Sequence, residues 1–437
     1  MSAVIAVLMV HTKEYHGRHS SFSLMQINQE HIDTINARFQ QMKTKEDLLE
    51  LVNFAKTLVY GEKAKAVPLK TLTYYGNIKA AGSAYKEFSI RKKSGGTRKI
   101  HSPVKGLKPI QKALNLILQC VFTPHQAATG FVPEKSIVDN ARVHRGMNYV
   151  YNIDLKDFFP SVDMKRVAAC LRIPPFNIID TNDAPLAFLI ANLCCTPIEV
   201  ERKNDKGEWE KKVLNVLPQG APTSPTVTNI ICQRLDRKLA GLARKHGAQY
   251  TRYADDITFS SMHNLYQPDS DFLKEMSAII ESQGFHVNPK KTRLQKIGYR
   301  KEVTGLVVND KVNVRRRYVK QIRRWLYLWE RYGYVQAEAI FRNDYRADKG
   351  NVKKGEPSLQ NVLDGKLLFL KMVKGEGDGT YLGLFKRYEE LVGKMIEGIA
   401  PASDEEIIEK ILDIWETQGI EIAEEKLNQL TPWMKED

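Results

Sequence analysis

Apolar residues recur at helical spacing through much of the first quarter of the chain. Residues 25–60 show this spacing twice, and the pattern predicts two helices, the second starting near Thr44. The spacing returns at 107–122. Between these segments, residues 85–103 alternate polar and apolar positions around a Gly-Gly pair, which predicts a basic β-hairpin. We therefore expect a helical region with one inserted hairpin.

The middle of the chain mixes strand-like alternation with helical spacing. Helices are expected near 163–172, 225–246 and 269–283. Strands are expected at 149–155 and on both sides of Asp255-Asp256. Two hairpins are also expected, a charged one around 205–207 and another at 302–314 that turns on Asn309-Asp310. The remainder is mostly helical in pattern. No internal repeat or low-complexity linker interrupts the sequence. This mixture indicates an α+β protein.

Charge adds a partner class to this picture. The chain carries 66 Lys and Arg against 51 Asp and Glu, a formal net charge of +15. A balance this basic favours a polyanionic partner, and nucleic acid is the first candidate. The five cysteines form no Cys-x-x-Cys pair and their number is odd, so the sequence indicates neither a zinc site nor a disulfide framework. A reducing cytoplasm fits this cysteine usage best.

The first ten residues, MSAVIAVLMV, are apolar but too short to span a bilayer, and they lack a basic leader. We therefore expect no membrane segment. Met25 opens the first well-patterned helical region, and we hypothesise that residues 1–24 lie upstream of the native start. The intact mass of the native protein would test this.

Two adjacent carboxylates stand out in the segment TRYADDITFS. Asp255 and Asp256 lie between short runs rich in β-branched and aromatic residues, which predicts a strand, a tight turn and a second strand. Such a turn holds both side chains at its tip. The alternative is ordinary turn chemistry on a solvated loop, since Asp favours turns.

A third carboxylate, Asp154, ends an apolar run in VYNIDLKDFFPSV, on what the pattern predicts to be a central strand. An unpaired carboxylate is costly to bury there, so a cap or a salt bridge is one explanation. The other is that Asp154, Asp255 and Asp256 converge on Mg²⁺, which prefers hard oxygen ligands. Nucleotidyl transfer uses one ion to activate a 3′-hydroxyl and another to hold the triphosphate.

Five segments, in this order and at these spacings, resemble the successive palm motifs of reverse transcriptases across residues 85–390. The segments are NIDLKDFFPSV, LPQGAPTSPTVTNIIC, TRYADDITFS, GFHVNPKKTRL and EVTGLVVNDKVNV. Two shorter elements, NARVH at 140–144 and VTG at 303–305, resemble the NAxxH and VTG elements of bacterial retron reverse transcriptases. Read alone, NARVH would be a helix end with a surface His, and VTG a strand opening.

The resemblance implies a catalytic site with two Mg²⁺ ions. Asp154 and Asp255 match the metal-ligating aspartates, and Asp256 matches the third carboxylate. Lys291, in NPKKT, matches a general acid that protonates the departing pyrophosphate, although Lys290 could serve equally well.

The resemblance also implies a dNTP site. Lys92 and Arg98, on the basic hairpin, match residues that grip the triphosphate; a solvated hairpin is the alternative. Phe159 stands where reverse transcriptases place an aromatic gate against a ribonucleotide 2′-hydroxyl, with Phe158 as its core-facing neighbour. Gln219 matches a residue that lies against the nucleotide, and Gly220 would permit close backbone approach.

For RNA binding, the resemblance points to Asn140 and His144 of NARVH. A helical wheel over 315–333 adds a second surface. It groups Tyr318, Ile322, Trp325 and Trp329 on one side and the cations Arg317, Lys320, Arg324 and Arg331 on another. One side can pack while the other meets phosphates of template and primer, although a solvated basic face is the alternative.

The last 37 residues differ from the rest of the chain. Residues 401–437 contain eleven acidic and three basic residues, a net charge of −8, which leaves +23 on the preceding 400. A capping box from Ser403 to Glu406 and an apolar stripe predict an acidic helical hairpin. It could dock an effector protein or pack on the thumb, and both options stay open.

The sequence therefore predicts an α+β, right-hand polymerase fold with fingers, an antiparallel-sheet palm and a helical thumb. The expected regions are 1–84 N-terminal helices, 85–148 fingers, 149–301 palm, 302–400 primer-grip hairpin and thumb, and 401–437 acidic extension. The implied function is RNA-directed DNA synthesis of retron type from dNTPs, in the cytoplasm, with branched RNA-DNA product and a role in antiphage defence. The alternatives are a defence-associated or group II intron-like reverse transcriptase without a retron RNA, and a noncatalytic RNA-binding scaffold.

Overall fold

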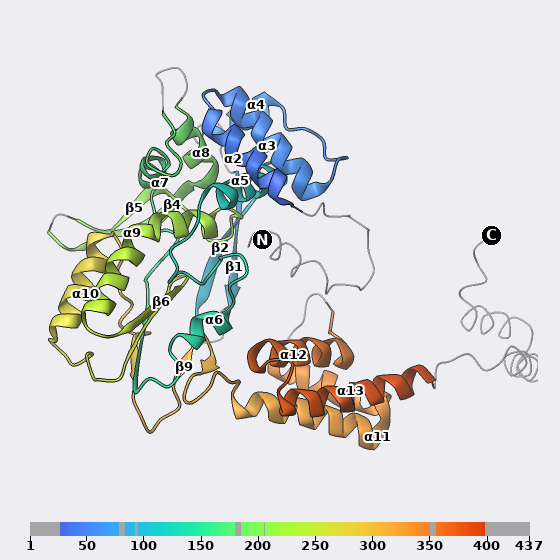
Figure 1. Ribbon diagram of the computed structural model, residues 1–437. Coiled ribbons are helices and arrows are strands. Elements are labelled where there is room, and N and C mark those ends of the chain that lie inside the picture. Colours follow the sequence, from blue (N-terminus) through green and yellow to red (C-terminus); the bar gives the residue numbers. More distant parts are fainter. Residues whose placement is uncertain are drawn as a thin grey trace, which may run out of the picture. The chain divides into compact units, whose positions relative to one another are not determined.

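The computed structural model describes residues 27–77, 84–91, 95–179, 185–204, 206–349 and 355–397 (Figure 1). The predictions for residues 1–24, for Lys92 and for the acidic hairpin at 401–437 lie outside these residues. The chain divides into two compact units, Met1–Asn313 and Val314–Asp437, and each is described by itself.

The first unit begins with helices that share one apolar core. They are α2 (Gln29–Gln41), α3 (Lys45–Tyr60), α4 (Leu69–Gly76) and α5 (Leu107–Val121). Thr44 caps α3 by accepting a hydrogen bond from the Asp47 backbone N–H, so the predicted helix start is confirmed. The buried face of α3 packs against α5. Helix α4 was not predicted, because it has eight residues and no capping side chain.

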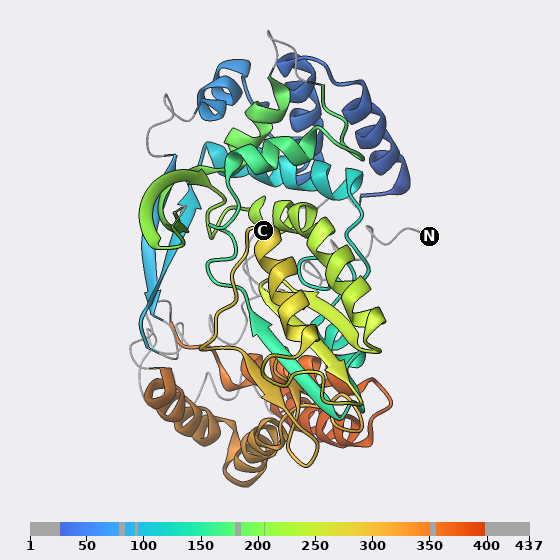
Figure 2. The same cartoon turned by 90° about the vertical axis from the view of Figure 1, so that its left-hand side faces the viewer.

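A four-stranded antiparallel sheet forms the centre of this unit, in the order β6-β7-β3-β8. Its strands are β3 (Tyr149–Asp154), β6 (Gln249–Tyr253), β7 (Asp256–Ser261) and β8 (Arg293–Gln295). Helices α9 (Ser224–Lys245) and α10 (Asp271–Ser282) cover one face of the sheet (Figure 2). Phe259 of β7 meets Phe272 of α10 edge to face, with ring centroids 5.1 Å apart.

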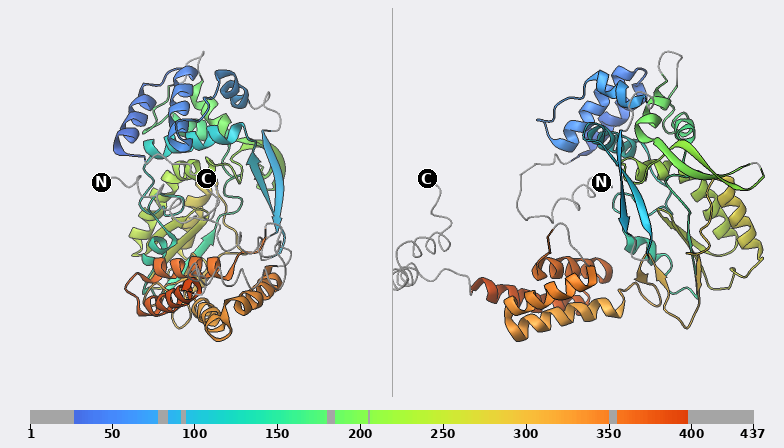
Figure 3. Two further views of the ribbon diagram at one scale, coloured as in Figure 1. Left: turned by 90° about the vertical axis from the view of Figure 1, so that its right-hand side faces the viewer. Right: turned by 180° about the vertical axis from the view of Figure 1, so that it is seen from behind.

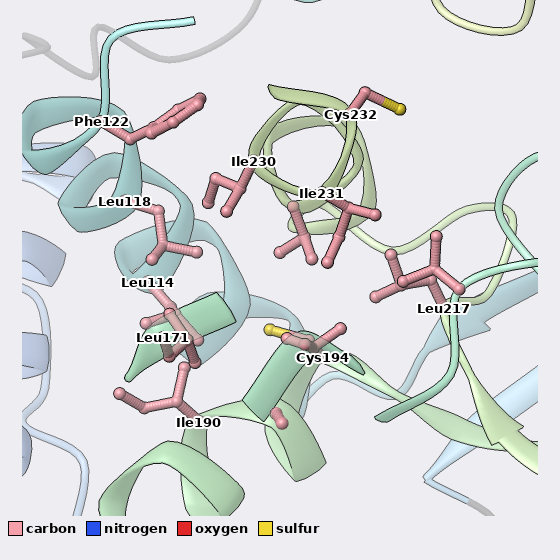
Figure 4. Packing of buried hydrophobic residues seen from close by; sticks show 14 of the residues in the cluster. Leu114, Leu118, Phe122, Leu171, Ile190, Cys194, Leu217, Ile230, Ile231 and Cys232 are labelled. Atoms are coloured by element: carbon pink, nitrogen blue, oxygen red, sulfur yellow. The ribbon is translucent and has the colours of Figure 1, made fainter. Parts of the chain in front are cut away.

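The helical core continues above the sheet through α7 (Met164–Leu171) and α8 (Leu186–Cys194). Leu118 of α5, Ile190 of α8 and Ile230 of α9 point toward one another in this core (Figure 4). The burial of these side chains from three segments far apart in sequence holds the N-terminal helices to the sheet unit. All five cysteines are free.

Two hairpins flank the sheet unit. The predicted basic hairpin is β1 (Tyr85–Arg91) with β2 (Thr97–Pro103), and the predicted charged hairpin is β4 (Thr196–Lys203) with β5 (Trp209–Val216). Both are antiparallel, so both predictions are confirmed. The His101 N–H donates to the Gln219 carbonyl at 2.8 Å, which ties β2 to the loop before α9.

The last hairpin of the first unit differs from its prediction. Strands β9 (Glu302–Val303) and β10 (Leu306–Val307) turn on Thr304-Gly305, where φ is +47° and +84°, and not on Asn309-Asp310. Two residues with positive φ match the right-handed twist of paired strands. A separate bridge between Val307 and Asn313 closes the loop that contains Asn309-Asp310.

The second unit is a bundle of α11 (Arg316–Lys349), α12 (Leu359–Lys374) and α13 (Gly379–Glu397), and each helix contacts the other two (Figure 3). Gly333, with φ +75° and ψ 167°, breaks α11 into two helical pieces. Trp325 and Phe341 meet edge to face across this break, with centroids 5.2 Å apart. The predicted helical character of this region is confirmed.

Candidate active site

Three carboxylates lie at one end of the central sheet. Asp154 is the last residue of β3, and its register partner is Asp256, the first residue of β7. Asp255 precedes Asp256 in the β6–β7 turn. The backbone carbonyl of Asp255 accepts a hydrogen bond from the Leu155 N–H at 3.0 Å. The two predicted acidic segments therefore meet on adjacent strands.

A buried ion pair anchors the turn that carries Asp255. Arg252, which is fully buried, contacts Asp236 of α9 at 2.7 Å and also donates to the Ala254 carbonyl at 3.2 Å. The Tyr250 hydroxyl donates to the same Asp236 carboxylate at 2.7 Å. These contacts satisfy both charges inside the protein and fix the backbone just before Asp255. Sequence reasoning missed them, and the one available signal was an arginine inside a predicted strand.

A glycine loop supports the same turn from the other side. A Cβ atom at Gly130 would lie 2.5 Å from the Ala254 backbone nitrogen, so only glycine fits. The Thr129 N–H donates to the Arg252 carbonyl at 2.8 Å. Ala254 itself has φ +56°, an uncommon value for a residue with a side chain. The loop and the ion pair together hold a backbone conformation that the turn alone would not favour.

Asp154 has two side-chain partners. Lys291 contacts one carboxylate oxygen at 2.7 Å, and the Asn288 amide donates to the other at 3.0 Å. The Lys291 side chain remains 57% exposed, whereas Asp154 is buried. Lys291 lines the cavity beside the carboxylates and Lys290 does not. Between the two lysines left open by the sequence, the geometry favours Lys291.

Crowding of the carboxylates changes their acidity. Burial, followed by the charge of Asp154, raises the pKa of Asp255. Asp256 is exposed at its strand end, yet neighbouring protein atoms desolvate its carboxyl, and with the charges of Asp255 and Asp154 they raise its pKa to about 6. A bound cation would offset this repulsion, and carboxylate oxygens are ligands that Mg²⁺ prefers.

The three carboxylates fit Mg²⁺ by their chemistry. Within the described part of the chain, however, no group of three or more His, Cys, Asp or Glu side chains is already arranged around a metal position. Because Lys291 holds Asp154 at 2.7 Å, ion binding would require this contact to loosen.

A cavity of about 600 Å³ opens beside the carboxylates. It is lined by Asp154 and Asp255 together with Arg98, Phe159 and Gln219. These residues come from β3, the β6–β7 turn, β2 and two loops, so the fold gathers into one site residues that the sequence analysis singled out separately. A volume of this size accommodates a nucleotide.

Gly220 lies next to this cavity with φ +124°. A Cβ atom there would lie 2.8 Å from the His101 carbonyl oxygen, so the close approach that glycine permits is that of the β1–β2 hairpin. The residue thus sets how closely the hairpin approaches the loop that carries Gln219.

Sequence reasoning also missed Phe131. Its backbone has φ +59°, and its ring lines the cavity at 6.3 Å from the Phe159 ring and 6.5 Å from the Tyr253 ring, measured between centroids. Phe158, by contrast, is buried and stacks on Phe285, as predicted for the core-facing neighbour of Phe159.

Comparison with known proteins places this geometry in a family. The family described as reverse transcriptase (RNA-dependent DNA polymerase) matches residues 90–321, more than half of the chain. The chain belongs to the reverse transcriptase family. This match and the mixed helix and sheet content confirm the predicted α+β, right-hand polymerase fold.

Several curated relatives are retron reverse transcriptases, so the predicted resemblance to this type is confirmed. Those of retrons Mx162 and Mx65 of Myxococcus xanthus are 36% identical over 264 residues and 35% identical over 303, covering 56% and 67% of this chain. The matches span only 52% and 62% of these relatives' own lengths. The retron Ec86 enzyme of Escherichia coli is 33% identical over 268 residues, covering 60% of this chain and 74% of the relative.

Among solved structures, the chain matches telomerases from Candida tropicalis and Candida albicans, at 16% and 10% identity with TM-scores of 0.36 and 0.39. The first match covers 53% of this chain and 55% of the telomerase, and the second covers 79% and 66%. These scores are too low to add to the assignment.

The first and last residues of the element NARVH, which resembles a retron-type motif, lie inside the protein and not on its surface. Asn140 and His144 are both 0% exposed. The His144 ring contacts the hydroxyls of Ser260 at 2.6 Å and Thr251 at 2.7 Å, and Asn140 accepts a hydrogen bond from Thr129 at 2.9 Å. RNA can reach neither side chain in this structure, because protein surrounds both.

In the second unit, the split predicted by the helical wheel is confirmed. Ile322, Trp325 and Trp329 are buried, and Tyr318 is half-buried. The cations Arg317, Lys320, Arg324 and Arg331 are all exposed. Arg324 is paired with Asp344 at 2.7 Å. Among the helices that the structure describes, none combines the length and apolar character needed to cross a membrane.

Proposed function

We propose that this chain is an RNA-directed DNA polymerase of retron type, which copies an RNA template into DNA from dNTPs. The observation that carries the proposal is that Asp154, Asp255 and Asp256 lie together at one end of the sheet. The cavity beside them is also lined by Phe159, Gln219 and Arg98. Acidic ligands, a basic residue and an aromatic wall are the parts that nucleotidyl transfer to a DNA end requires.

The three aspartates would hold Mg²⁺. When bound, two such ions lower the pKa of the attacking 3′-hydroxyl and stabilise the charge of the leaving pyrophosphate. Asp255 and Asp256 must be deprotonated to act as ligands, and their raised pKa values make this state costly without a cation nearby.

The surrounding residues would bind the triphosphate, select the sugar and donate a proton. Arg98 would grip the triphosphate as an always-charged donor. Phe159 would exclude a ribonucleotide by clashing with its 2′-hydroxyl, and Gln219 would lie against the bound dNTP. Lys291, released from Asp154, would donate the proton to pyrophosphate. Lys92 would assist Arg98.

The retron type specifies the template. We propose that the enzyme copies a cognate structured RNA into branched RNA-DNA, acts in antiphage defence with an effector protein, and works in the cytoplasm. The names of its relatives support the retron type. The exposed cations of α11 would contact template and primer phosphates, and Asn140 with His144 would act indirectly, by positioning the palm strands. For the fingers, palm and thumb, we propose the boundaries that the sequence predicts.

The test is primer extension on an RNA template with Mg²⁺ and dNTPs, combined with sequencing of nucleic acid that copurifies with the protein. The enzyme should extend the primer, and the copurified RNA should map beside its gene. Extension without such an RNA would favour the defence-associated or group II intron-like alternative. Specific RNA binding with no extension would favour the noncatalytic scaffold.

A further inference from the structure

The loop that carries Phe159 has an uncommon backbone conformation. Asp157 has φ +47°, and the Ser161 N–H donates to the Asp157 carbonyl at 2.8 Å, so residues 157–161 form a tight turn. The Phe159 ring is only partly buried, at the edge of the cavity. An aromatic side chain on such a turn needs support from outside it to keep one position.

The backbone of this turn is held from outside by the β4–β5 hairpin, through two adjacent residues of β4. Arg202 donates from Nη2 to the Pro160 carbonyl at 2.5 Å, immediately after Phe159. Glu201 pairs with Lys156 at 2.7 Å, three residues before Phe159. The hairpin therefore holds the turn on both sides of the aromatic residue.

Of the two contacts, the one from Arg202 is the better supported. Its guanidinium is half-buried, and Nη1 also donates to the Glu201 carbonyl at 3.1 Å, so its direction is fixed at two points. The Glu201–Lys156 pair is more exposed, and an exposed ion pair contributes little. At the base of the hairpin, the Leu217 N–H donates to the Val162 carbonyl at 3.0 Å and keeps strand and turn together.

We propose that Arg202 is a positioning residue for sugar selection: by holding the Pro160 carbonyl, it keeps the Phe159 ring where a ribonucleotide 2′-hydroxyl would clash. This inference rests on the proposed polymerase function and on Phe159 as the gate. It gives the charged β4–β5 hairpin, which the polymerase motifs leave without a role, a part in substrate specificity.

The experiment measures kcat/KM for dGTP and for GTP on poly(rC) primed with oligo(dG), so that the two substrates share one base. Arg202→Ala should lower the dGTP:GTP ratio by about tenfold, mainly by improving GTP use, because a small displacement of the ring opens space for the hydroxyl. Arg202→Lys keeps the charge and one donor and should restore part of the ratio. Lys212→Ala, an exposed and ion-paired position on β5 away from the cavity, is the matched control and should keep the wild-type ratio.

A double variant separates positioning from other roles. In a Phe159→Ala background, Arg202→Ala should change the ratio no further, because the ring that it positions is gone. Equal losses of kcat/KM for dGTP and GTP would overturn the inference, since they would indicate a phosphate contact or general damage. Thermal unfolding of each variant identifies general damage, and Arg202→Lys serves as the test if Arg202→Ala does not fold.

The outcomes for the two proposals differ. No extension by the wild-type enzyme would overturn the polymerase function itself. If Phe159→Ala lowers the dGTP:GTP ratio and Arg202→Ala does not, Phe159 remains the proposed gate and the role of Arg202 is overturned. An unchanged ratio in Phe159→Ala would remove the gate and the role of Arg202 with it.

Discussion

Two groups of polar residues on the same pair of strands behave in opposite ways. At the β6–β7 turn, Asp255 lines the cavity and Asp256 follows it directly in sequence, and the pKa values of both carboxyl groups are raised. Within the same strands, Thr251 and Ser260 bind the buried ring of His144, and each of these side chains has a partner. The crowded carboxylates of the turn destabilise the fold and are typical of a functional site. The hydrogen bonds between His144, Thr251 and Ser260 satisfy these side chains within the protein.

The comparison separates residues that sequence motifs alone group together. NARVH and TRYADDITFS both carry a family resemblance, yet only the second presents its polar groups to a cavity. Substitutions at the two places should therefore affect different measurements: activity in one case and the free energy of unfolding in the other.

The largest expected effect is at the turn. Asp255→Asn should reduce dNTP incorporation by about a thousandfold or more, because a neutral amide replaces a proposed metal ligand. Its free energy of unfolding should stay equal to that of the wild type or rise slightly, since the fold disfavours the charged carboxylate. Primer extension and urea unfolding measure the two quantities, and RNA binding should be nearly unchanged. Wild-type incorporation by this variant would refute the metal assignment.

The next effect is on stability and concerns His144. His144→Ala should lower the free energy of unfolding by about 3 kcal/mol, because it leaves a cavity and two unpaired buried hydroxyls. Initiation on the cognate RNA and extension of a generic primer should then fall together. His263→Ala, at an exposed histidine, is the control and should change neither. Selective loss of initiation with unchanged stability would point instead to an RNA-specific role.

A pH series sharpens the same contrast. Burial lowers the pKa of His144 to about 3 from its ordinary value of 6.5, so the unfolded chain takes up the proton first as the pH falls. The resulting stability is complete above pH 6.5 and decreases progressively down to about pH 3. At pH 5 the loss from this residue should be about 2 kcal/mol. It is measured as the pH-dependent difference between the wild type and His144→Ala, and a difference that does not vary with pH would contradict the burial of a neutral ring.

The smallest effect is expected on the surface of α11. Lys320→Ala should weaken RNA-DNA binding slightly at low salt and reduce the slope of log K against log salt by about 1, as loss of one phosphate contact does. Arg346→Ala, where the arginine is already paired with Glu356, is the control on the same helix and should keep the slope. An unchanged slope for Lys320→Ala would indicate that Lys320 contacts no phosphate and that this basic face is only solvated.

Periodicity predicted most elements because their partners are local. The α3 cap at Thr44, both long hairpins and the acidic turn follow from residues within a few positions of one another. The Arg252–Asp236 pair could not be predicted, since its members lie 16 residues apart on a strand and a helix and meet only in the packed fold. His144 was expected at the surface when its helix was considered alone, and long-range packing against β6 and β7 determines its burial.

The strand order has a consequence for synthesis of the chain. β3 is made before the other strands of its sheet but lies between β7 and β8, and Lys291 follows its partner Asp154 by 137 residues. At about 5–20 residues per second, a ribosome needs roughly 7 to 27 seconds to synthesise the 137 residues that separate Asp154 from Lys291. During this interval the nascent chain carries an acidic strand end without its lysine, and contacts this distant in sequence form slowly. Nascent chains that stop before β8 should therefore lack an assembled catalytic end, however much of the N-terminal helical core has already formed.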